Sequence, residues 1–138
     1  MRGFGARGTR GASLSLRVLA TTLTPGRAEG APLRLDEPLS FWGGIDSTTG
    51  RIIDRRHPQA GELVSGRILM MAAGRGSSSG SAALAEALRR GVGPAAILLL
   101  KRDPIVIVGA LAAMELYGRS CPVALTATQD WALSLIHI

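Results

Sequence analysis

The sequence predicts the α/β fold class, with one domain built on a partly parallel sheet. Short apolar runs typical of buried strands alternate with segments of helical periodicity, and glycines end the helical segments. A glycine- and serine-rich turn joins one of these strands to the helix that follows it. Such alternation is the pattern of βαβ units, whose strands run parallel. The 138 residues are enough for one domain with a hydrophobic core.

The first half of the chain contains four candidate strands. Residues 17–20 are a candidate first strand, and residues 31–35 alternate enough in polarity to form a second. Residues 47–54 predict a turn that leads into another short strand, and residues 55–62 predict a loop. The apolar run within residues 63–72 predicts the strand that leads into the glycine–serine turn.

The second half alternates helix and strand more regularly. Residues 82–90 have the spacing of a helix, which a glycine–proline segment stops. Residues 95–100 form a continuous apolar run, which is typical of a strand buried on both faces. Residues 121–125 predict the last strand.

The stretch between the last two strands has two interpretations. It is either a helix that Asp103 caps, with Pro104 at its first position, or a short strand followed by a helix over residues 110–117. In both interpretations Gly118 ends the helix.

Charge argues against a nucleic-acid partner. The net charge is +6, but the first 27 residues carry five arginines and no acid, so the rest of the chain is close to neutral. A nucleic-acid site needs a basic patch with aromatics on the folded part, and none is evident.

No apolar run approaches the roughly 20 residues that cross a bilayer, so we expect no membrane partner. We expect a cytoplasmic protein, with the mitochondrion as the alternative if the basic leader is a transit peptide.

The single cysteine, Cys121, excludes an internal disulfide and cannot hold a metal cluster alone. We therefore expect a buried thiol, no metal site and no cofactor on this chain.

The turn over residues 73–81 is the strongest candidate for chemistry. Unpaired N–H groups and the dipole at the start of a helix attract anions, and glycines let the backbone approach them. Arg75 adds a planar fork for a carboxylate or phosphate, and three serines supply hydroxyls. The spacing fits neither a Walker loop nor a dinucleotide fingerprint. The alternative is that Ser79 or Ser81 merely caps the helix.

Two other segments carry candidate site residues. Phe41 and Trp42 stand beside the glycine pair Gly43–Gly44, which suggests either a site wall with close backbone approach or a tryptophan that fills the core. His57 precedes a proline in a loop, and either contacts substrate or is structural.

With these residues in view, the chain resembles the small subunit of the aconitase X family, the swivelling domain found with cis-3-hydroxy-L-proline dehydratase and phosphomevalonate dehydratase. The likeness covers about residues 24–130. It is carried, in the family's order, by these segments: residues 38–46 (PLSFWGGID), 49–50 (TG), 57–58 (HP), 61–62 (GE), 74–81 (GRGSSSGS) and 93–97 (GPAAI).

The resemblance implies a swivelling β/β/α domain, with mixed sheets and flanking helices, docked on a separate large subunit that holds an iron–sulfur cluster. It implies a hydro-lyase that dehydrates a hydroxy acid such as cis-3-hydroxy-L-proline, with Ser77 as the base and Ser78 or Ser79 as alternatives. The usual aconitase turn continues with arginine and glutamate where this chain has Ser79 and Gly80. We expect Arg75, on the other side of the serines, to replace that arginine in part. The expected substrate-binding residues are Arg75, Gly76, Ser78, Ser79, Gly43, Gly44 and His57.

The resemblance places the base on this chain and the cluster on the large subunit, so we expect this chain to be inactive without its large partner. The alternative functions are a non-catalytic module that binds an anionic small molecule and a purely structural swivelling domain.

We expect three segments along the chain. Residues 1–22 are a disordered leader or the product of a start codon assigned too far upstream, and residues 23–132 are the swivelling domain, truncated at its C-terminal end. Residues 133–138 (LSLIHI) have the sequence of a translated library adaptor, with a genuine short apolar strand as the alternative.

Overall fold

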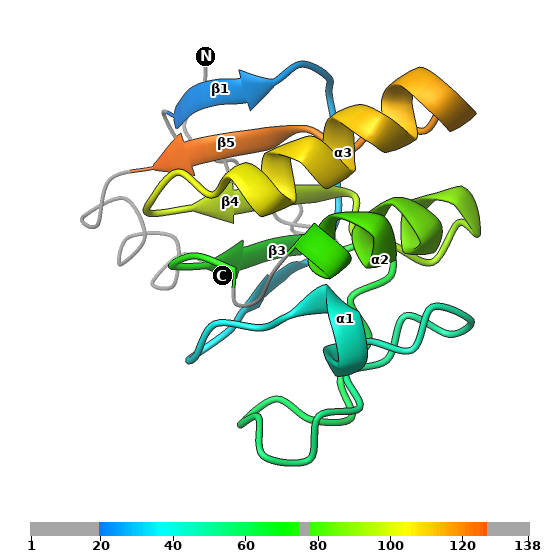
Figure 1. Cartoon of the computed structure of the whole chain (residues 1–138). Coiled ribbons are helices and arrows are strands. Elements are labelled where there is room, and N and C mark those ends of the chain that lie inside the picture. The colour runs from blue at the N-terminus through cyan, green and yellow to red at the C-terminus, as the bar shows by residue number, and fades with distance from the viewer. Residues whose placement is uncertain (1–19, 75–77, 127–138) are drawn as a thin grey trace, which may run out of the picture.

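A five-stranded mixed sheet organises the structure, a computed structural model that describes residues 20–74 and 78–126 (Figure 1). The strand order is β1-β5-β4-β3-β2, where four neighbouring strands run parallel and β1 pairs antiparallel with β5 at one edge. The strands are β1 (Ala20–Thr24), β2 (Pro32–Arg34), β3 (Ile68–Met71), β4 (Ala96–Leu99) and β5 (Val123–Thr126).

Two long helices connect the parallel strands and cover the same face of the sheet. Helix α2 (Ser78–Arg89) joins β3 to β4, and α3 (Pro104–Tyr117) joins β4 to β5. Both lie in front of the strands in Figure 1, as expected for successive crossovers of one hand that advance in one direction across the sheet. The short element α1 (Phe41–Gly44) packs beside α2. The predicted α/β class, with a mixed sheet and flanking helices, is confirmed.

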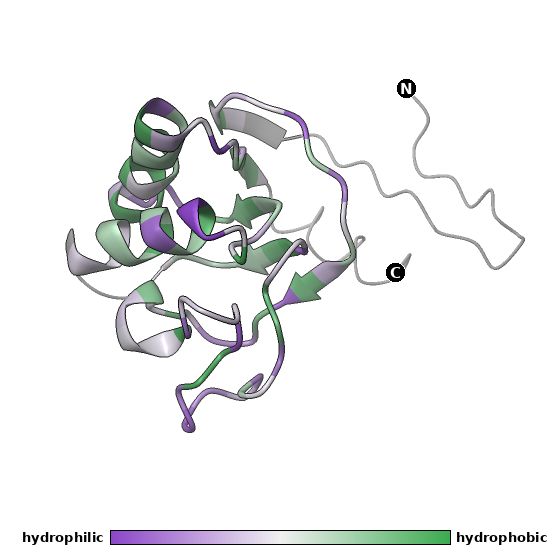
Figure 2. Ribbon diagram, turned by 90° about the vertical axis from the view of Figure 1, so that its right-hand side faces the viewer, coloured by the Kyte–Doolittle hydropathy of each residue, from purple (hydrophilic) through white to green (hydrophobic). Residues whose placement is uncertain are grey.

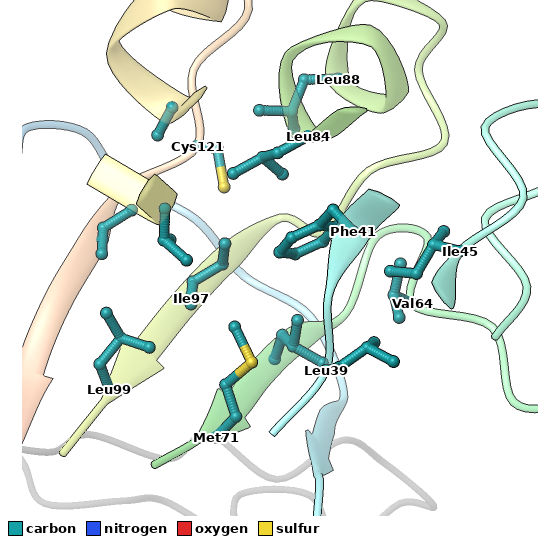
Figure 3. Packing of buried hydrophobic residues seen from close by; sticks show 14 of the residues in the cluster. Leu39, Phe41, Ile45, Val64, Met71, Leu84, Leu88, Ile97, Leu99 and Cys121 are labelled. Carbon is teal, nitrogen blue, oxygen red and sulfur yellow. The ribbon is translucent and has the colours of Figure 1, made fainter. Parts of the chain in front are cut away.

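The core lies between the sheet and the helices. One row of the sheet aligns apolar residues of four strands at the same level, since Leu69 pairs with Leu33 and Ile97, and Ile97 pairs with Val123. All four side chains are buried. Phe41 belongs to the same core cluster, and Figure 3 shows it with Leu84 of α2 above it and Ile97 of β4 beside it.

Hydropathy follows the same arrangement. Figure 2 shows hydrophobic residues concentrated in the strands and in the helices beside them, and many hydrophilic residues along the loop that connects α1 to β3. Among the described residues no helix is both long and apolar enough to cross a membrane.

Helix α3 follows the first of the two interpretations of its sequence. Asp103 is the N-cap and accepts a hydrogen bond from the N–H of Ile105, while Pro104 occupies the first turn. Gly118 closes the helix in the left-handed conformation at φ 65°. The alternative, a short strand followed by a helix over residues 110–117, is wrong, because the cap starts the helix six residues earlier.

Three other element boundaries differ from the sequence-based expectation. The strand expected over residues 63–72 is confined to β3, because Gly66 adopts φ +69° and the N–H of Arg67 bonds back to Val64 in a turn. Within residues 47–54 only Arg51 and Ile52 form isolated bridges. Helix α2 begins four residues before the expected residue 82.

The structure describes only part of the segments that the sequence predicts at the two ends of the chain. Of the candidate first strand over residues 17–20, only Ala20 is described, and it opens β1. The expected leader over residues 1–22 lies outside the described residues apart from its last three, and the expected adaptor-derived tail over residues 133–138 lies wholly outside them.

Candidate functional site

The glycine–serine turn leaves the sheet at the carboxyl end of β3. The next segment along this edge follows β4, and the two are joined, because the carbonyl of Ala72 accepts hydrogen bonds from the N–H groups of Leu100 (3.1 Å) and Lys101 (3.0 Å). In α/β proteins with parallel strands, ligands bind outside the carboxyl ends of the strands. The chain therefore enters the turn at the edge where this fold class places its binding sites.

Gly74, the second residue of the turn and the last one described before Ser78, is anchored by two contacts. Its N–H donates to the Oδ2 of Asp103 at 2.6 Å. Gly74 also forms an isolated parallel bridge with Leu39, which brings the segment before α1 next to the turn. A Cβ on Gly74 would lie 2.6 Å from that Asp103 oxygen, so only a hydrogen fits there.

The first turn of α2 packs against the start of α3. The Oγ of Ser81 donates to the carbonyl of Ile105 at 2.7 Å. Gly80 is buried, and a Cβ there would lie 3.2 Å from the Ile105 side chain. The two helices thus begin side by side at the carboxyl edge of the sheet, and Gly74 lies next to the N-terminus of α3.

Ser79 and Ser81 lie inside α2 rather than before it. The interpretation in which one of them merely caps the helix is therefore wrong, and Ser81 bonds to a carbonyl of the neighbouring helix instead. Ser79 is exposed to solvent, and Ser78 is the first residue of α2.

The other predicted residues of the turn are Arg75, Gly76 and the expected base Ser77. They lie outside the described residues, between Gly74 and Ser78. Their roles stay predictions.

The element α1 is a tight turn rather than a regular helix. Trp42 (φ −82°, ψ 116°) and Gly43 (φ 79°, ψ −13°) have the dihedral angles of the two central residues of a type II turn. The Oγ of Ser40 accepts from the Trp42 N–H at 3.2 Å. Gly43 supplies the positive φ, and Gly44 makes room for Leu39, whose Cδ1 would lie 2.9 Å from an added Cβ.

This turn separates the two neighbouring aromatic residues. Phe41 is 4% exposed and belongs to the core, whereas Trp42 is 68% exposed. The interpretation in which Trp42 fills the core is therefore wrong. The substrate-binding role expected for Gly43 and Gly44 stays a prediction, although the Leu39–Gly74 bridge places their segment beside the turn.

His57 is buried and uses both ring nitrogens in bonds to the main chain. Its Nδ1 accepts from the N–H of Gln59 at 3.0 Å, so the neutral ring carries its proton on Nε2 and donates it to the carbonyl of Glu37 at 2.9 Å. The Gln59 side chain adds two bonds to Asp36. His57 thereby ties its loop to the segment that leads to Leu39, and its expected contact with substrate stays a prediction.

The clear pKa shifts in the described part of the chain belong to groups that lie away from the turn. Burial raises the pKa of the Cys121 thiol to about 12, as expected for the predicted buried cysteine. Hydrogen bonds from Arg89 and Arg90 hold the pKa of Glu86, on the exposed side of α2, at about 2. Within residues 20–74 and 78–126, no group of three or more histidine, cysteine or acidic residues could hold a metal ion.

Sequence reasoning identified Asp103 as a helix cap and missed its second contact. The residue stands 29 positions after Gly74, and no local pattern connects them. Only the neighbouring positions of β3 and β4 in the sheet bring the two loops together. The one signal in the sequence was the Asp-Pro pair at the end of a buried strand.

The sheet order, the helices on one face and the turn at the carboxyl edge define an α/β domain built from consecutive parallel βαβ units. Residues 17–135 match the family described as the aconitase X swivel domain. The chain belongs to this family.

Individual relatives agree with this assignment. The chain is 46% identical over 107 residues to a cis-3-hydroxy-L-proline dehydratase of Pseudomonas aeruginosa, covering 78% of this chain and 18% of that protein. It is 38% identical over 98 residues to the phosphomevalonate dehydratase small subunit of Methanothermobacter thermautotrophicus, covering 71% and 75%. The crystal structure of aconitase X from Thermococcus kodakaraensis, holo-form, superimposes with a TM-score of 0.69 at 29% identity, covering 77% and 76%. The chain thus spans less than a fifth of the length of the Pseudomonas relative.

Proposed function

We propose that this chain is the swivel-domain component of an aconitase X-type dehydratase and completes an active site together with a larger polypeptide. The observation that carries the proposal is the family match, combined with a glycine–serine turn at the carboxyl edge of the parallel strands. The two relatives compared by sequence above are a dehydratase and a dehydratase small subunit, which supports a hydro-lyase role for this chain.

In the proposed reaction, the hydroxyl of Ser77 acts as the base, with Ser78 and Ser79 as alternatives. In its alkoxide form Ser77 takes a proton from the substrate carbon, the neighbouring carbon loses its hydroxyl group as hydroxide, and a carbon–carbon double bond forms between the two carbons. The hydroxide then takes the proton from the Ser77 hydroxyl and leaves as water, which regenerates the alkoxide. A serine hydroxyl is a weak acid, so the alkoxide needs stabilisation. The N-terminus of α2 offers N–H groups and the positive end of a helix dipole, and Arg75 adds a guanidinium two residues from Ser77.

The proposed substrate is a hydroxy acid, and cis-3-hydroxy-L-proline is the preferred one. Its carboxylate suits a site with unpaired helix N–H groups and the planar fork of Arg75. Gly76 and the neighbouring serines would bring further donors close to it. A phosphorylated mevalonate is the alternative substrate, which the similarity to phosphomevalonate dehydratase small subunits supports.

The proposed partner supplies the rest of the site. A relative named as a small subunit implies a large one, whereas the matching part of the Pseudomonas relative is 18% of a single longer protein. The partner region is therefore either a separate subunit or further sequence on the same polypeptide. We place the iron–sulfur cluster on that partner, because the described residues of this chain do not fit it: Cys121 is buried, and no ligand group surrounds it.

A chimera tests this division of labour and does not require the natural partner. The segment of the Pseudomonas dehydratase that matches this chain is replaced by residues 17–135, and turnover of cis-3-hydroxy-L-proline is measured beside the 138-residue chain alone. We expect turnover by the chimera and none by the lone chain. Turnover by the lone chain would contradict the shared site, and a folded chimera that turns over neither cis-3-hydroxy-L-proline nor phosphomevalonate would favour a binding or structural module.

A further inference from the structure

Asp103 is a buried carboxylate whose two oxygens accept different main-chain hydrogen bonds. Oδ1 accepts from the N–H of Ile105 at 2.9 Å, and Oδ2 accepts from the N–H of Gly74 at 2.6 Å. The residue is only 9% exposed. Burying a charged group is costly unless hydrogen bonds compensate, and bonds to an ionised acceptor are stronger than neutral ones. The two N–H groups are therefore held firmly to one rigid side chain.

Capping α3 alone does not require a carboxylate. Serine, threonine and asparagine are also favourable N-cap residues, and each uses a single side-chain oxygen. The second oxygen of Asp103 serves a residue 29 positions earlier in the chain, at the end of the loop that follows β3. The fit there is close, because an added Cβ on Gly74 would approach this oxygen to 2.6 Å and the Val106 side chain to 3.2 Å.

The chain after the turn is held by the same part of α3. The Oγ of Ser81 donates to the carbonyl of Ile105, two residues from Asp103. Gly74 and Ser81, on the two sides of the three residues that include Ser77, are thus both bonded to residues 103–105. The start of α3 therefore sets the distance and direction between the point where the chain enters this segment and the helix that follows it.

We propose that Asp103 is a positioning residue for the proposed site: its carboxylate holds Gly74, the last described residue before Ser77, against the N-terminus of α3. The effect on catalysis rests on the proposed function, whereas the effect on the backbone does not. Each oxygen of Asp103 accepts a main-chain hydrogen bond, which suits a positioning role.

The substitution Asp103→Asn separates the two tasks of the side chain. Asparagine retains one oxygen for the N–H of Ile105 and caps helices as well as aspartate, so α3 keeps its N-cap. Its amide group places a donor, in place of an acceptor, opposite the Gly74 N–H. The control is Thr24→Val, because the Thr24 hydroxyl also accepts a main-chain N–H while buried, from Val123 at 2.8 Å, but lies on the edge strand β1.

The first measurement uses amide NMR on the 138-residue chain. In Asp103→Asn we expect the Gly74 amide proton to move upfield and to exchange with solvent about tenfold faster or more, since it loses a charged acceptor. The amide resonances of residues 75–78 should shift with it. In Thr24→Val these resonances should stay at their wild-type positions.

The second measurement is turnover in the chimera. If residue 103 positions the base, Asp103→Asn should lower kcat by up to about 100-fold with KM changed by less than about threefold. Thr24→Val should leave kcat unchanged although it lowers the unfolding midpoint. Equal kcat losses in both variants would show a general loss of stability and overturn the proposal. If the wild-type chimera has no activity, the proposed function fails, and unchanged amides of residues 75–78 in Asp103→Asn would then overturn the positioning role by themselves.

Discussion

Gly109 of α3 passes so close to the main-chain carbonyl of Ser81 in α2 that a Cβ on Gly109 would lie 2.9 Å from that oxygen. It would also lie 3.1 Å from two atoms of Leu84, a core residue. A glycine in the middle of a helix is unfavourable by about 1 kcal/mol relative to alanine. Here it allows the two helices to approach backbone to backbone beside the serine turn.

We expect Gly109→Ala to lower the free energy of unfolding by about 1–2 kcal/mol, because the backbone oxygen cannot yield as a flexible side chain would. Urea unfolding followed by circular dichroism measures this. The matched control is Val108→Ala on the exposed side of the same helix, which should be neutral or slightly stabilising. If Gly109→Ala gained the stability that helix propensity alone predicts, the close approach of the helices would be wrong.

Adjacent aromatic residues should respond in opposite ways to truncation. Phe41→Ala removes a buried ring that packs beside Leu84 and Ile97, so we expect a loss of about 3–5 kcal/mol in unfolding free energy. Trp42→Ala removes a side chain that is 68% exposed, so we expect a change within about 0.5 kcal/mol. Chemical denaturation of both variants checks the orientation of the type II turn. Similar losses for the two would contradict it.

The hydrogen bonds of His57 predict its tautomer. At neutral pH, long-range proton–nitrogen NMR of the imidazole should show the proton on Nε2 and an unprotonated Nδ1. His57→Ala should lower the unfolding free energy by about 1–3 kcal/mol, because it leaves the Gln59 N–H and the Glu37 carbonyl without these partners. A proton on Nδ1 would contradict the described loop.

The Cys121 thiol should be unreactive in the folded chain and should make stability depend on pH at the alkaline end. Burial raises its pKa from 9.0 to about 12, so folding favours the neutral thiol. Its contribution is fully present below pH 9 and is lost as the pH rises towards 12, because the unfolded chain ionises first. Thiol-modifying reagents at about pH 8 should label the protein only at the rate of unfolding. Rapid labelling of the folded chain would show an accessible thiolate.

The alkaline loss of stability has its own control. Cys121→Ala removes the thiol, so its unfolding midpoint should fall less between about pH 9 and pH 11 than that of the wild type. Equal slopes in the two proteins would assign the pH dependence to other groups.

The elements with local signals could be predicted from the sequence. The Asp-Pro pair and Gly118 mark both ends of α3, and the continuous apolar run over residues 95–100 marks β4. The strand before the turn was predicted too long, because Gly66 starts a turn inside an apolar segment. Phe41 is buried and Trp42 is exposed because Gly43 adopts a positive φ. The sequence contains two neighbouring glycines at this point and does not indicate which of them has the positive φ.

The surroundings of the serine turn could not be derived in the same way. The bond from Gly74 to Asp103 and the bond from Ser81 to Ile105 join residues that are 29 and 24 positions apart. Both depend on β3 and β4 being neighbours in the sheet and on α2 and α3 starting at the same edge. Residue types and spacing identified the turn, whereas its hydrogen bonds to the start of α3 became evident only from the tertiary structure.

The central claim is that the hydroxyl of Ser77 is the base of a shared dehydratase site, and turnover by Ser77→Ala in the chimera tests it most directly. The comparison is Ser79→Ala, which removes the hydroxyl of an alternative base, and sedimentation and circular dichroism check that each chimera stays homogeneous and folded. We expect Ser77→Ala to lower kcat by about 100-fold to 10,000-fold, the range typical of a lost general base, and Ser79→Ala to lower it far less. A Ser77→Ala chimera that retained its kcat within a few-fold would contradict the account.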